Sequence, residues 1–384
     1  MNPRERLMCA LNHKEPDRVP LDLGAGKSCK FTISAYRKIL DYLGIEEEVR
    51  VVGAFNELYN LAHASDAVLE KLGCDVRVPL PNYIVDSSGY PVERWADEHD
   101  FYLLDQWGTK HRMPKDESKY YSMVSAPLEG AGADQDRDYK WPSPVRVRPE
   151  QVEEARKYHE QGYPVSIPDH YSNGFLQAGP NIYGYQQWLT MLVSQKKRAE
   201  AILDKLLELK IQHWDNIIDA FGDTIDIISE CDDLGAQNST LVSPSMFRKI
   251  FKPYWKKLYD HIRSKTDAKI FMHSCGSIYD ILPDLIEVGV EIINPVQIGA
   301  ANMGPAAIKK EFGRDITFWG GGINTQETLP LGTPTQVKDE VKRNLDIFKK
   351  DGGYVFATIH NLQGECPIEN VIAMLEAYRE NCAY

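Results

Sequence analysis

From about residue 165 onward, short apolar runs alternate with longer amphipathic stretches, and this alternation constrains the fold most strongly. The apolar runs predict strands, and the amphipathic stretches between them predict helices. Repeated strand–helix units place their strands parallel in one sheet. The predicted strands are 165–168, 225–229, 269–273, 292–296, 316–319 and 354–359. The predicted helices are 199–221, 246–264, 278–288, 304–312 and 335–350.

The number of strands favours a sheet that closes on itself. Further strand candidates in the first third of the chain, beginning with 18–24, bring the number toward the eight of a (β/α)8 TIM barrel. A doubly wound sheet is the alternative, but no Gly-x-Gly-x-x-Gly opens an early helix. We therefore predict an α/β fold in which residues 1–384 form a single (β/α)8 barrel domain.

The first part of the chain departs from the repeating pattern. Asn2 followed by Pro3 is typical of a helix start, and we expect an N-terminal helical segment to about residue 12. A second helix is predicted over 33–43. Between about 75 and 140, short aromatic and β-branched runs are separated by turn residues, which predicts an inserted antiparallel excursion. The segment Gly24-Ala-Gly-Lys-Ser28 lacks the full spacing of a phosphate-binding loop.

Net charge and cysteine usage limit the class of protein. The formal net charge is -12, which argues against nucleic acid or an anionic membrane as the main partner. Seven widely spaced cysteines, with no signal peptide before them, indicate a reduced compartment. No apolar run approaches the ~20 residues that span a bilayer. We therefore expect a cytoplasmic protein.

Acidic, imidazole, thiol and amide side chains follow the predicted strands at their carboxyl ends. In a barrel these ends meet on one face, where active sites lie. The chemical types favour a functional site over a chance scatter of loop residues. We expect Asp232, Asp233 and His360 to be catalytic. We expect five further residues to bind substrate: His170, Gln237, Gln297, Asn324 and Asn361.

His273 and Cys275 are the strongest candidates for metal ligands. In an extended segment, residues two apart point to the same side, so both side chains can face one ion. Zinc is held by imidazole and thiolate, and catalytic zinc sites keep one position open. His360 is the predicted third ligand, with Glu230 or Cys366 as further candidates. Taken alone, the pair fits equally well a buried thiol beside a hydrogen-bonded histidine.

Two other features have two interpretations each. The run Gly320-Gly-Gly322 permits close backbone approach, either by a phosphate or by a bulky flat ligand or neighbouring loop that packs on it. Tyr183, Tyr185 and Trp188 either line the mouth of the site or belong to the core, and the core is the more frequent place for such aromatic residues.

A set of motifs spread over nearly the whole chain resembles the uroporphyrinogen decarboxylase superfamily. Singly the motifs are weak, but their order is specific. The resemblance implies a (β/α)8 barrel and, within the superfamily, the cobalamin-dependent methyltransferase branch. The motifs are Pro16-Asp-Arg-Val-Pro20, Asp232-Asp-Leu-Gly-Ala-Gln237, His273-Ser-Cys-Gly-Ser277, Asn294-Pro-Val-Gln297, Trp319-Gly-Gly-Gly-Ile323 and His360-Asn-Leu-Gln363.

Departures from the family patterns narrow what the resemblance implies. The arginine-rich motif by which the decarboxylase grips its tetracarboxylate substrate is not found after Pro20. Thiol-methylating members hold zinc with a His-x-Cys pair and a distant cysteine, and the distant position here is His360. The motifs are more similar to the methyltransferase component of anaerobic O-demethylases.

The resemblance thus implies methyl transfer from an O-methyl donor, a methoxylated aromatic, to a corrinoid protein. It implies assistance at the ether oxygen, either by zinc on His273, Cys275 and His360 or by an acid from Asp232 or Asp233. It also implies cobalamin carried by the partner protein. The alternatives are methyl transfer from a methylcorrinoid to a thiol and a decarboxylase-like reaction, with a non-catalytic barrel as a reading from another class. A barrel of this size is also compatible with a homodimer.

Overall fold

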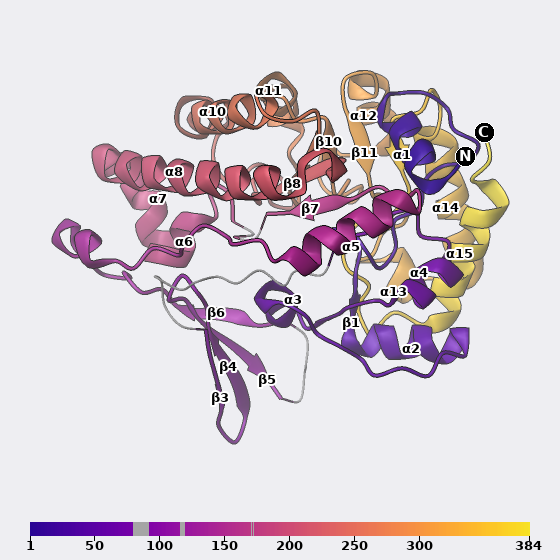
Figure 1. Ribbon diagram of the computed structural model, residues 1–384, viewed down its shortest axis with the longest axis horizontal. Helices are drawn as coiled ribbons and strands as arrows, with labels where there is room; N and C mark the ends of the chain where they lie inside the picture. Colours follow the sequence, from indigo (N-terminus) through magenta and orange to yellow (C-terminus); the bar gives the residue numbers. More distant parts are fainter. Residues whose placement is uncertain (80–91, 116–119, 170, 172) are drawn as a thin grey trace.

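The computed structural model describes residues 1–79, 92–115, 120–169, 171 and 173–384, so that His170 lies outside the described residues. A parallel sheet covered by helices forms the body of the molecule (Figure 1). A small antiparallel sheet projects from one side of this body, and the two chain termini lie near each other (Figure 1).

The parallel sheet contains the six strands predicted from the alternating pattern. Their order is β12-β11-β10-β9-β8-β7, so each strand pairs with the next one along the chain. The register aligns His273 with Cys231 on one side and with Asn294 on the other. The polar ends of three strands are therefore level with one another. The strands are β7 (Ser166–Pro168), β8 (Ile227–Cys231), β9 (Lys269–His273), β10 (Ile292–Asn294), β11 (Thr317–Trp319) and β12 (Tyr354–Val355).

Two segments near the amino terminus, around Leu21 and Arg77, each form one β-bridge beside an edge strand of this sheet. Asp22 N donates to Phe356 O at 2.9 Å, which attaches the first segment beside β12. Asp75 N donates to Leu21 O at 2.8 Å, and Arg77 bridges Val165 beside β7. The predicted early strand at 18–24 thus forms bridges only. The α/β fold with a parallel sheet is confirmed, whereas a closed eight-stranded barrel is not assigned within the described residues.

Helices follow the strands and cover the sheet (Figure 1). The five helices predicted in this region are present, with ends shifted by a few residues. They are α8 (Lys196–Phe221), α10 (Lys252–Arg263), α11 (Leu282–Val288), α12 (Pro305–Phe312) and α14 (Pro334–Phe348). Helices not anticipated from the sequence are α6 (Ala178–Tyr183), α7 (Tyr185–Ser194), α13 (Thr328–Leu331) and α15 (Ile368–Asn381), and the short α9 (Pro244–Met246) precedes a π-helical turn at Phe247–Phe251.

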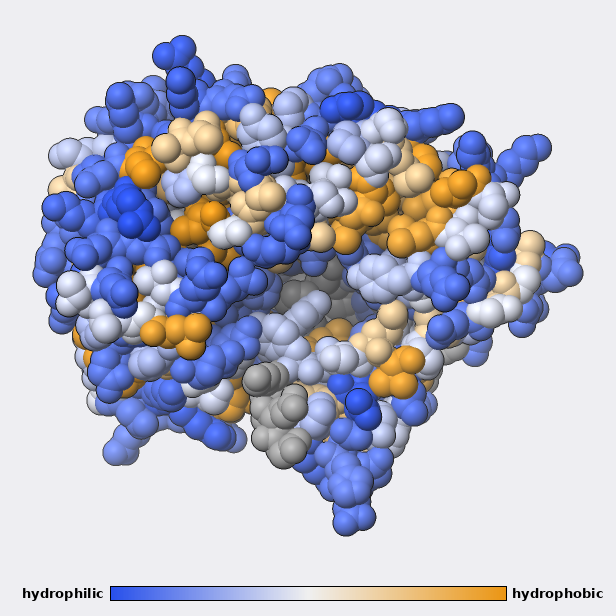
Figure 2. Space-filling view, turned by 180° about the vertical axis from the view of Figure 1, so that it is seen from behind, coloured by the Kyte–Doolittle hydropathy of each residue, from blue (hydrophilic) through white to orange (hydrophobic). Residues whose placement is uncertain are grey.

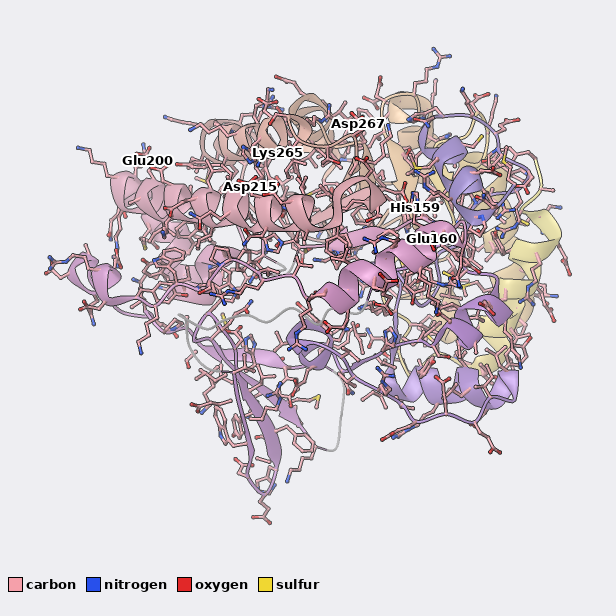
Figure 3. The ribbon with its side chains drawn as sticks, in the orientation of Figure 1. His159, Glu160, Glu200, Asp215, Lys265 and Asp267 are labelled. Atoms are coloured by element: carbon pink, nitrogen blue, oxygen red, sulfur yellow. The ribbon has the colours of Figure 1, made fainter. Side chains whose placement is uncertain are left out.

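Ion pairs join the outer helices on the side away from the strand ends. Asp215 of α8 accepts from Lys265, which follows α10, and from His261 of α10, both at 2.7 Å. Figure 3 shows Asp215 and Lys265 on neighbouring outer elements. Exposed pairs of this kind contribute little stability each.

The amino-terminal helices begin where the sequence predicts. In α1 (Pro3–Leu11) the Asn2 side chain accepts from Glu5 N, and the Glu5 side chain accepts in return from Asn2 N. The predicted helix at 33–43 is α2 (Ile33–Leu43), which ends at Gly44 with φ +62°. Between them β1 (Phe31–Thr32) pairs with β2 (Leu61–Ala62). The remaining helices before the insertion are α3 (Ala54–Leu58) and α4 (Asp66–Leu72).

The inserted region is antiparallel, as predicted. Its order is β3-β4-β5-β6, with bounds β3 (Glu93–Ala96), β4 (Asp100–Leu104), β5 (Lys110–Pro114) and β6 (Ser122–Ser125). A turn over residues 105–109 joins β4 to β5. The Asp105 carboxylate accepts from Trp107 N at 2.9 Å and from Thr109 N at 3.0 Å, which fixes the turn into β5. A 3-10 turn at Ala133–Asp138 and α5 (Pro149–Glu160) lead back to β7.

The two ambiguous features are decided by packing. At Gly322 an added Cβ would lie 2.4 Å from the Phe356 ring, so the neighbouring chain fills the space beside the glycine run. Tyr183 and Trp188 are buried and stacked with ring centroids 6.4 Å apart, so both belong to the core. Tyr185 alone of the three aromatic residues is exposed, at 49%.

Candidate active site

Three candidate metal ligands converge at the carboxyl ends of β9 and β12. The ligand atoms of His273, Cys275 and His360 all lie within 4.8 Å of one another. Cys275 Sγ is 3.5 Å from His273 Nε2, and the two imidazole rings meet edge to face with centroids 5.9 Å apart. Two imidazoles and a thiol are suited to zinc, and the spacing is that of ligands around one small ion.

A buried asparagine sets the orientation of His273. The Asn294 Nδ2 group donates to Trp319 O at 3.1 Å, so its amide oxygen faces the histidine. His273 Nδ1 lies 2.7 Å from Asn294 Oδ1, and an amide oxygen only accepts, so Nδ1 carries the proton. The Nε2 lone pair is then free to face Cys275. Such a bond fixes the tautomer that a metal-binding histidine needs.

Burial sets the protonation states of the three groups. Desolvation lowers the pKa of His273, and it lowers the pKa of His360 to about 4, assisted by the neighbouring His273. Both imidazoles are therefore neutral near pH 7 and can donate lone pairs. Burial raises the pKa of Cys275 well above its ordinary value, so this thiol would release its proton on binding a metal.

The loops after β8 and β9 pack closely, which positions Cys275. Gly276 has φ +84°, and an added Cβ there would lie 2.5 Å from Gly235 C. This close approach brings Asp233 Oδ1 to 3.0 Å from Cys275 N, which donates to it, and to 3.7 Å from His273 Nε2. Asp233 is thus the carboxylate beside the three candidate ligands.

The adjacent Asp232 occupies a different environment. Both of its carboxylate oxygens accept from backbone N–H groups, of Leu176 and Gln177, each at 2.9 Å. The side chain is fully buried, and burial raises the pKa of Asp232 to about 7. Asp232 therefore holds the loop after β7 in place and does not line the cavity beside the cluster. The catalytic role expected for both acids stays a prediction, and of the two Asp233 is the one that lies beside the candidate ligands.

Of the predicted substrate-binding residues, some line the cavity and others support nearby loops or lie elsewhere. Asn361 lines the cavity, and its side chain accepts from Lys30 N at 3.0 Å. Gln297 accepts from Gly276 N at 2.8 Å and donates to Gln237, which supports the loop that holds Cys275. Asn324 accepts from the backbone N–H groups of residues 326 and 327 and lies outside this cavity.

The further metal candidates lie apart from the three-ligand group. Glu230 is fully buried and accepts from Lys210 at 2.7 Å and from Trp214 Nε1 at 2.6 Å. Lys210 also pairs with Asp169 at 3.0 Å. Burial raises the pKa of Glu230 to about 7, and the nearby Asp169 carboxylate adds to this shift. Cys366 is buried and lines a smaller cavity with Cys275, but it is not among the grouped ligands.

A cavity of about 440 Å³ opens over the cluster, with His273, His360, Asn361 and Asp233 among its lining residues. A second cavity of about 250 Å³ lies beyond His360 and Asn361, which line both. The wall of the larger cavity is rich in aromatic residues from the first half of the chain. These aromatic residues are Tyr59, Trp107, His111, Tyr121 and Tyr171, and Lys27 also lines the cavity. Only Tyr171 follows a predicted strand, and the sequence patterns did not point to the others as site residues.

Among the described residues, no helix has the length and hydrophobicity that a bilayer crossing requires.

Comparisons with known proteins identify the family. The family model described as uroporphyrinogen decarboxylase (URO-D) matches residues 175–381. No curated protein matches the chain in sequence. A solved structure of a methyltransferase from Methanosarcina mazei is 18% identical, with a TM-score of 0.62 and coverage of 99% of both chains.

Two further matched structures are more distant. An endo-1,4-beta-xylanase from Penicillium canescens has a TM-score of 0.36 at 8% identity and covers 60% of this chain and 79% of its own. A beta-glucosidase from Pyrococcus furiosus has a TM-score of 0.36 at 10% identity and covers 82% of this chain and 83% of its own. TM-scores this low show no relationship in fold or function. The Methanosarcina structure shows the fold over the full length, and the family match covers more than half of the sequence, so the chain belongs to the uroporphyrinogen decarboxylase family.

Proposed function

We propose that the protein is a methyltransferase that moves a methyl group from an O-methyl donor, a methoxylated aromatic, to a corrinoid protein. The observation that carries the proposal is the group of His273, Cys275 and His360 beneath a cavity walled by aromatic side chains. The likeness to the Methanosarcina methyltransferase in fold is consistent with it.

The reaction has a simple balance of bonds and electrons. The bond between the methyl carbon and the ether oxygen breaks, and a bond between this carbon and cobalt forms. The oxygen keeps the bonding electron pair and takes up a proton, while cobalt(I) becomes cobalt(III). The phenoxide is a poor leaving group, so the site must assist at the oxygen.

The residues of the chain divide this task. His273, Cys275 and His360 would hold zinc, which when bound supplies a Lewis acid at its open position. Asn294 keeps the Nε2 lone pair of His273 directed into the group. Asp233, partly exposed and 3.7 Å from His273 Nε2, would pass a proton between solvent and the departing oxygen. The aromatic wall would hold the donor ring and exclude water.

The corrinoid would be presented by its carrier protein at the mouth of the cavity. Tyr185 of α7 lines the cavity, and Leu189 and Val193 follow at one-turn intervals on the exposed face of the same helix. These three residues form an apolar stripe, with exposures of 49%, 39% and 61%. Figure 2 shows a hollow with hydrophobic side chains near its rim on the face turned away in Figure 1. An apolar rim of this kind is suited to a protein partner.

A decarboxylase acting on a tetracarboxylate is less well supported. Among the described residues that line the larger cavity there is no arginine, the natural partner for carboxylates. Methyl transfer to a thiol would use the same three ligands. However, thiol-methylating members of the family use a distant cysteine as the third ligand, whereas this chain has His360 in that position and Cys366 lies outside the group. Demethylation of an ether is therefore the better match.

We also infer that the parallel sheet closes as an eight-unit barrel. The bridges of Leu21 with Phe356 and of Arg77 with Val165 connect both edge strands through two early segments, which supports closure.

The direct test incubates zinc-loaded protein with cob(I)alamin and each of a panel of methoxylated aromatics. Absorption spectroscopy monitors the conversion of cob(I)alamin to methylcob(III)alamin. Methylcobalamin formation that is lost in Cys275→Ser would support the proposal. Transfer from methylcobalamin to a thiol, with no reaction of any ether, would favour the alternative direction.

A further inference from the structure

A glutamine in the loop after β7 contacts both acids of the loop after β8. Gln177 directly precedes α6, is partly buried and lines the larger cavity. Its side-chain Nε2 donates to Asp233 O at 2.9 Å, and its backbone N donates to Asp232 Oδ1 at 2.9 Å. The two loops are therefore joined at Gln177, once through its side chain and once through its backbone.

The contact with Asp233 leads directly to a candidate metal ligand. Asp233 Oδ1 accepts from Cys275 N at 3.0 Å, so Asp233 is held at its carbonyl by Gln177 and at its carboxylate by the Cys275 backbone. The loops after β8 and β9 also touch, because a Cβ added at Gly235 would lie 2.6 Å from Cys275 O. A displacement of Asp233 would therefore be passed on to the segment that carries the thiol.

The other end of the Gln177 amide is fixed at the mouth of the cavity. Tyr185 OH donates to Gln177 Oε1 at 2.8 Å. A side-chain amide has one acceptor end and one donor end, so this bond directs the donor end toward Asp233. Tyr185 is 49% exposed on α7. A continuous series of hydrogen bonds thus runs from Tyr185 through Gln177 and Asp233 to Cys275.

We propose that Gln177 is a positioning residue for the metal group: it holds Asp233 so that the Cys275 thiol stays directed at the two imidazoles, and Tyr185 orients the Gln177 amide. This role rests on the metal group of the proposed function and not on the transfer of methyl. Groups that orient the ligands of a tetrahedral ion contribute to its affinity without touching it.

The test replaces Gln177 by methionine, which keeps the length of the side chain and removes both of its hydrogen bonds. Zinc competition against a chromophoric chelator measures the dissociation constant. Gln177→Met should raise this constant about tenfold, the lower end of the range for groups that orient metal ligands. Tyr185→Phe removes only the bond at the far end and should raise it by about two- to fivefold. Tyr185→Phe in the Gln177→Met background should change nothing further, because the series is already broken.

A spectroscopic measurement separates positioning from stability. Cobalt(II) bound in place of zinc gives a thiolate-to-metal absorption band that reports on Cys275, and Gln177→Met should shift or weaken this band. Gln187→Met is the matched control, because Gln187 is also partly buried, accepts from Gly130 N at 2.7 Å and donates to Ala131 O at 2.9 Å. It should lose comparable stability in urea and keep the wild-type band and zinc affinity.

The outcomes separate this role from the proposed function. A folded Gln177→Met protein with the wild-type cobalt band, and zinc affinity within about twofold of the wild type, would overturn the positioning role. If Gln177→Met does not fold, Tyr185→Phe decides, because an unchanged band and affinity in that variant would overturn the role and a changed band would support it.

None of these measurements needs a methyl donor. Metal affinity that depends on Gln177, in a protein that demethylates no ether, would support the positioning role and count against the proposed function. A wild-type protein that binds neither zinc nor cobalt(II) would overturn the metal group and the positioning role together.

Discussion

Replacing Asn294 by leucine should reduce zinc affinity without removing a ligand. Asn294 and His273 are buried, and the 2.7 Å bond between them fixes the proton on Nδ1. Loss of a partner that orients a metal-binding histidine typically costs about 10- to 100-fold in affinity, or about 1.4–2.7 kcal/mol. Zinc competition against a chromophoric chelator would measure the change in the dissociation constant.

The same substitution should also destabilise the fold. It leaves His273 Nδ1–H and Trp319 O without their partner, and each such buried group costs about 1–3 kcal/mol. Asn344→Leu is the matched control, because Asn344 is equally buried and donates to Gly321 O and Gly322 O. It should lose comparable stability in urea but keep wild-type zinc affinity. A folded Asn294→Leu protein that binds zinc within about twofold of the wild type would refute the orienting role.

Three other predictions concern the ligands, the rim and pH. Cys275→Ser should lower bound zinc well below one per chain by elemental analysis, and an unchanged content would rule out the thiolate as a ligand. Leu189→Glu and Val193→Glu should weaken binding of the corrinoid carrier protein about tenfold or more, as for centrally placed apolar contacts, while a methoxylated aromatic binds as before in calorimetry. Burial raises the pKa of Glu230 to about 7, so between its ordinary value near 4.5 and pH 7 the native state binds more protons than the unfolded state. The contribution of Glu230 to stability is therefore lost as pH rises through this window, and Glu230→Gln should flatten the slope seen in urea unfolding; an unchanged slope would mean that Lys210 keeps this carboxylate charged.

The sequence predicted the periodic parts of the fold well. All six strands of the parallel sheet were located, because buried parallel strands are nearly continuous apolar runs. Helices α6, α7 and α15 were missed. α6 is only six residues long, and α7 exposes part of its apolar surface, so neither shows the usual pattern of a core-facing helix. The strand β5 (Lys110–Pro114) was not located, although the turn before it combines the Asp105 side chain with Gly108 at φ +78°.

The sequence predicted the three candidate metal ligands better than it predicted the residues that line the cavity above them. His273, Cys275 and His360 end or follow strands, so parallel pairing alone brings them together. Asp232 and Asp233 could not be separated in advance, because their roles depend on which loop supplies backbone N–H groups. Lys27 and Trp107 come from an early loop and from the insertion, and no periodic pattern relates these segments to the strand ends.

The predicted ligands and the unpredicted wall residues come from different parts of the chain. The family match covers residues 175–381, which contain His273, Cys275, His360 and Asp233. Lys27, Tyr59, Trp107 and Tyr171 all lie before it, and they form the wall that a substrate would contact. In the proposed function, the three candidate ligands come from the matched range, and much of the aromatic wall comes from residues that precede it. Substitutions before residue 175 should therefore change which ether binds, while substitutions at the three ligands should abolish reaction with every ether.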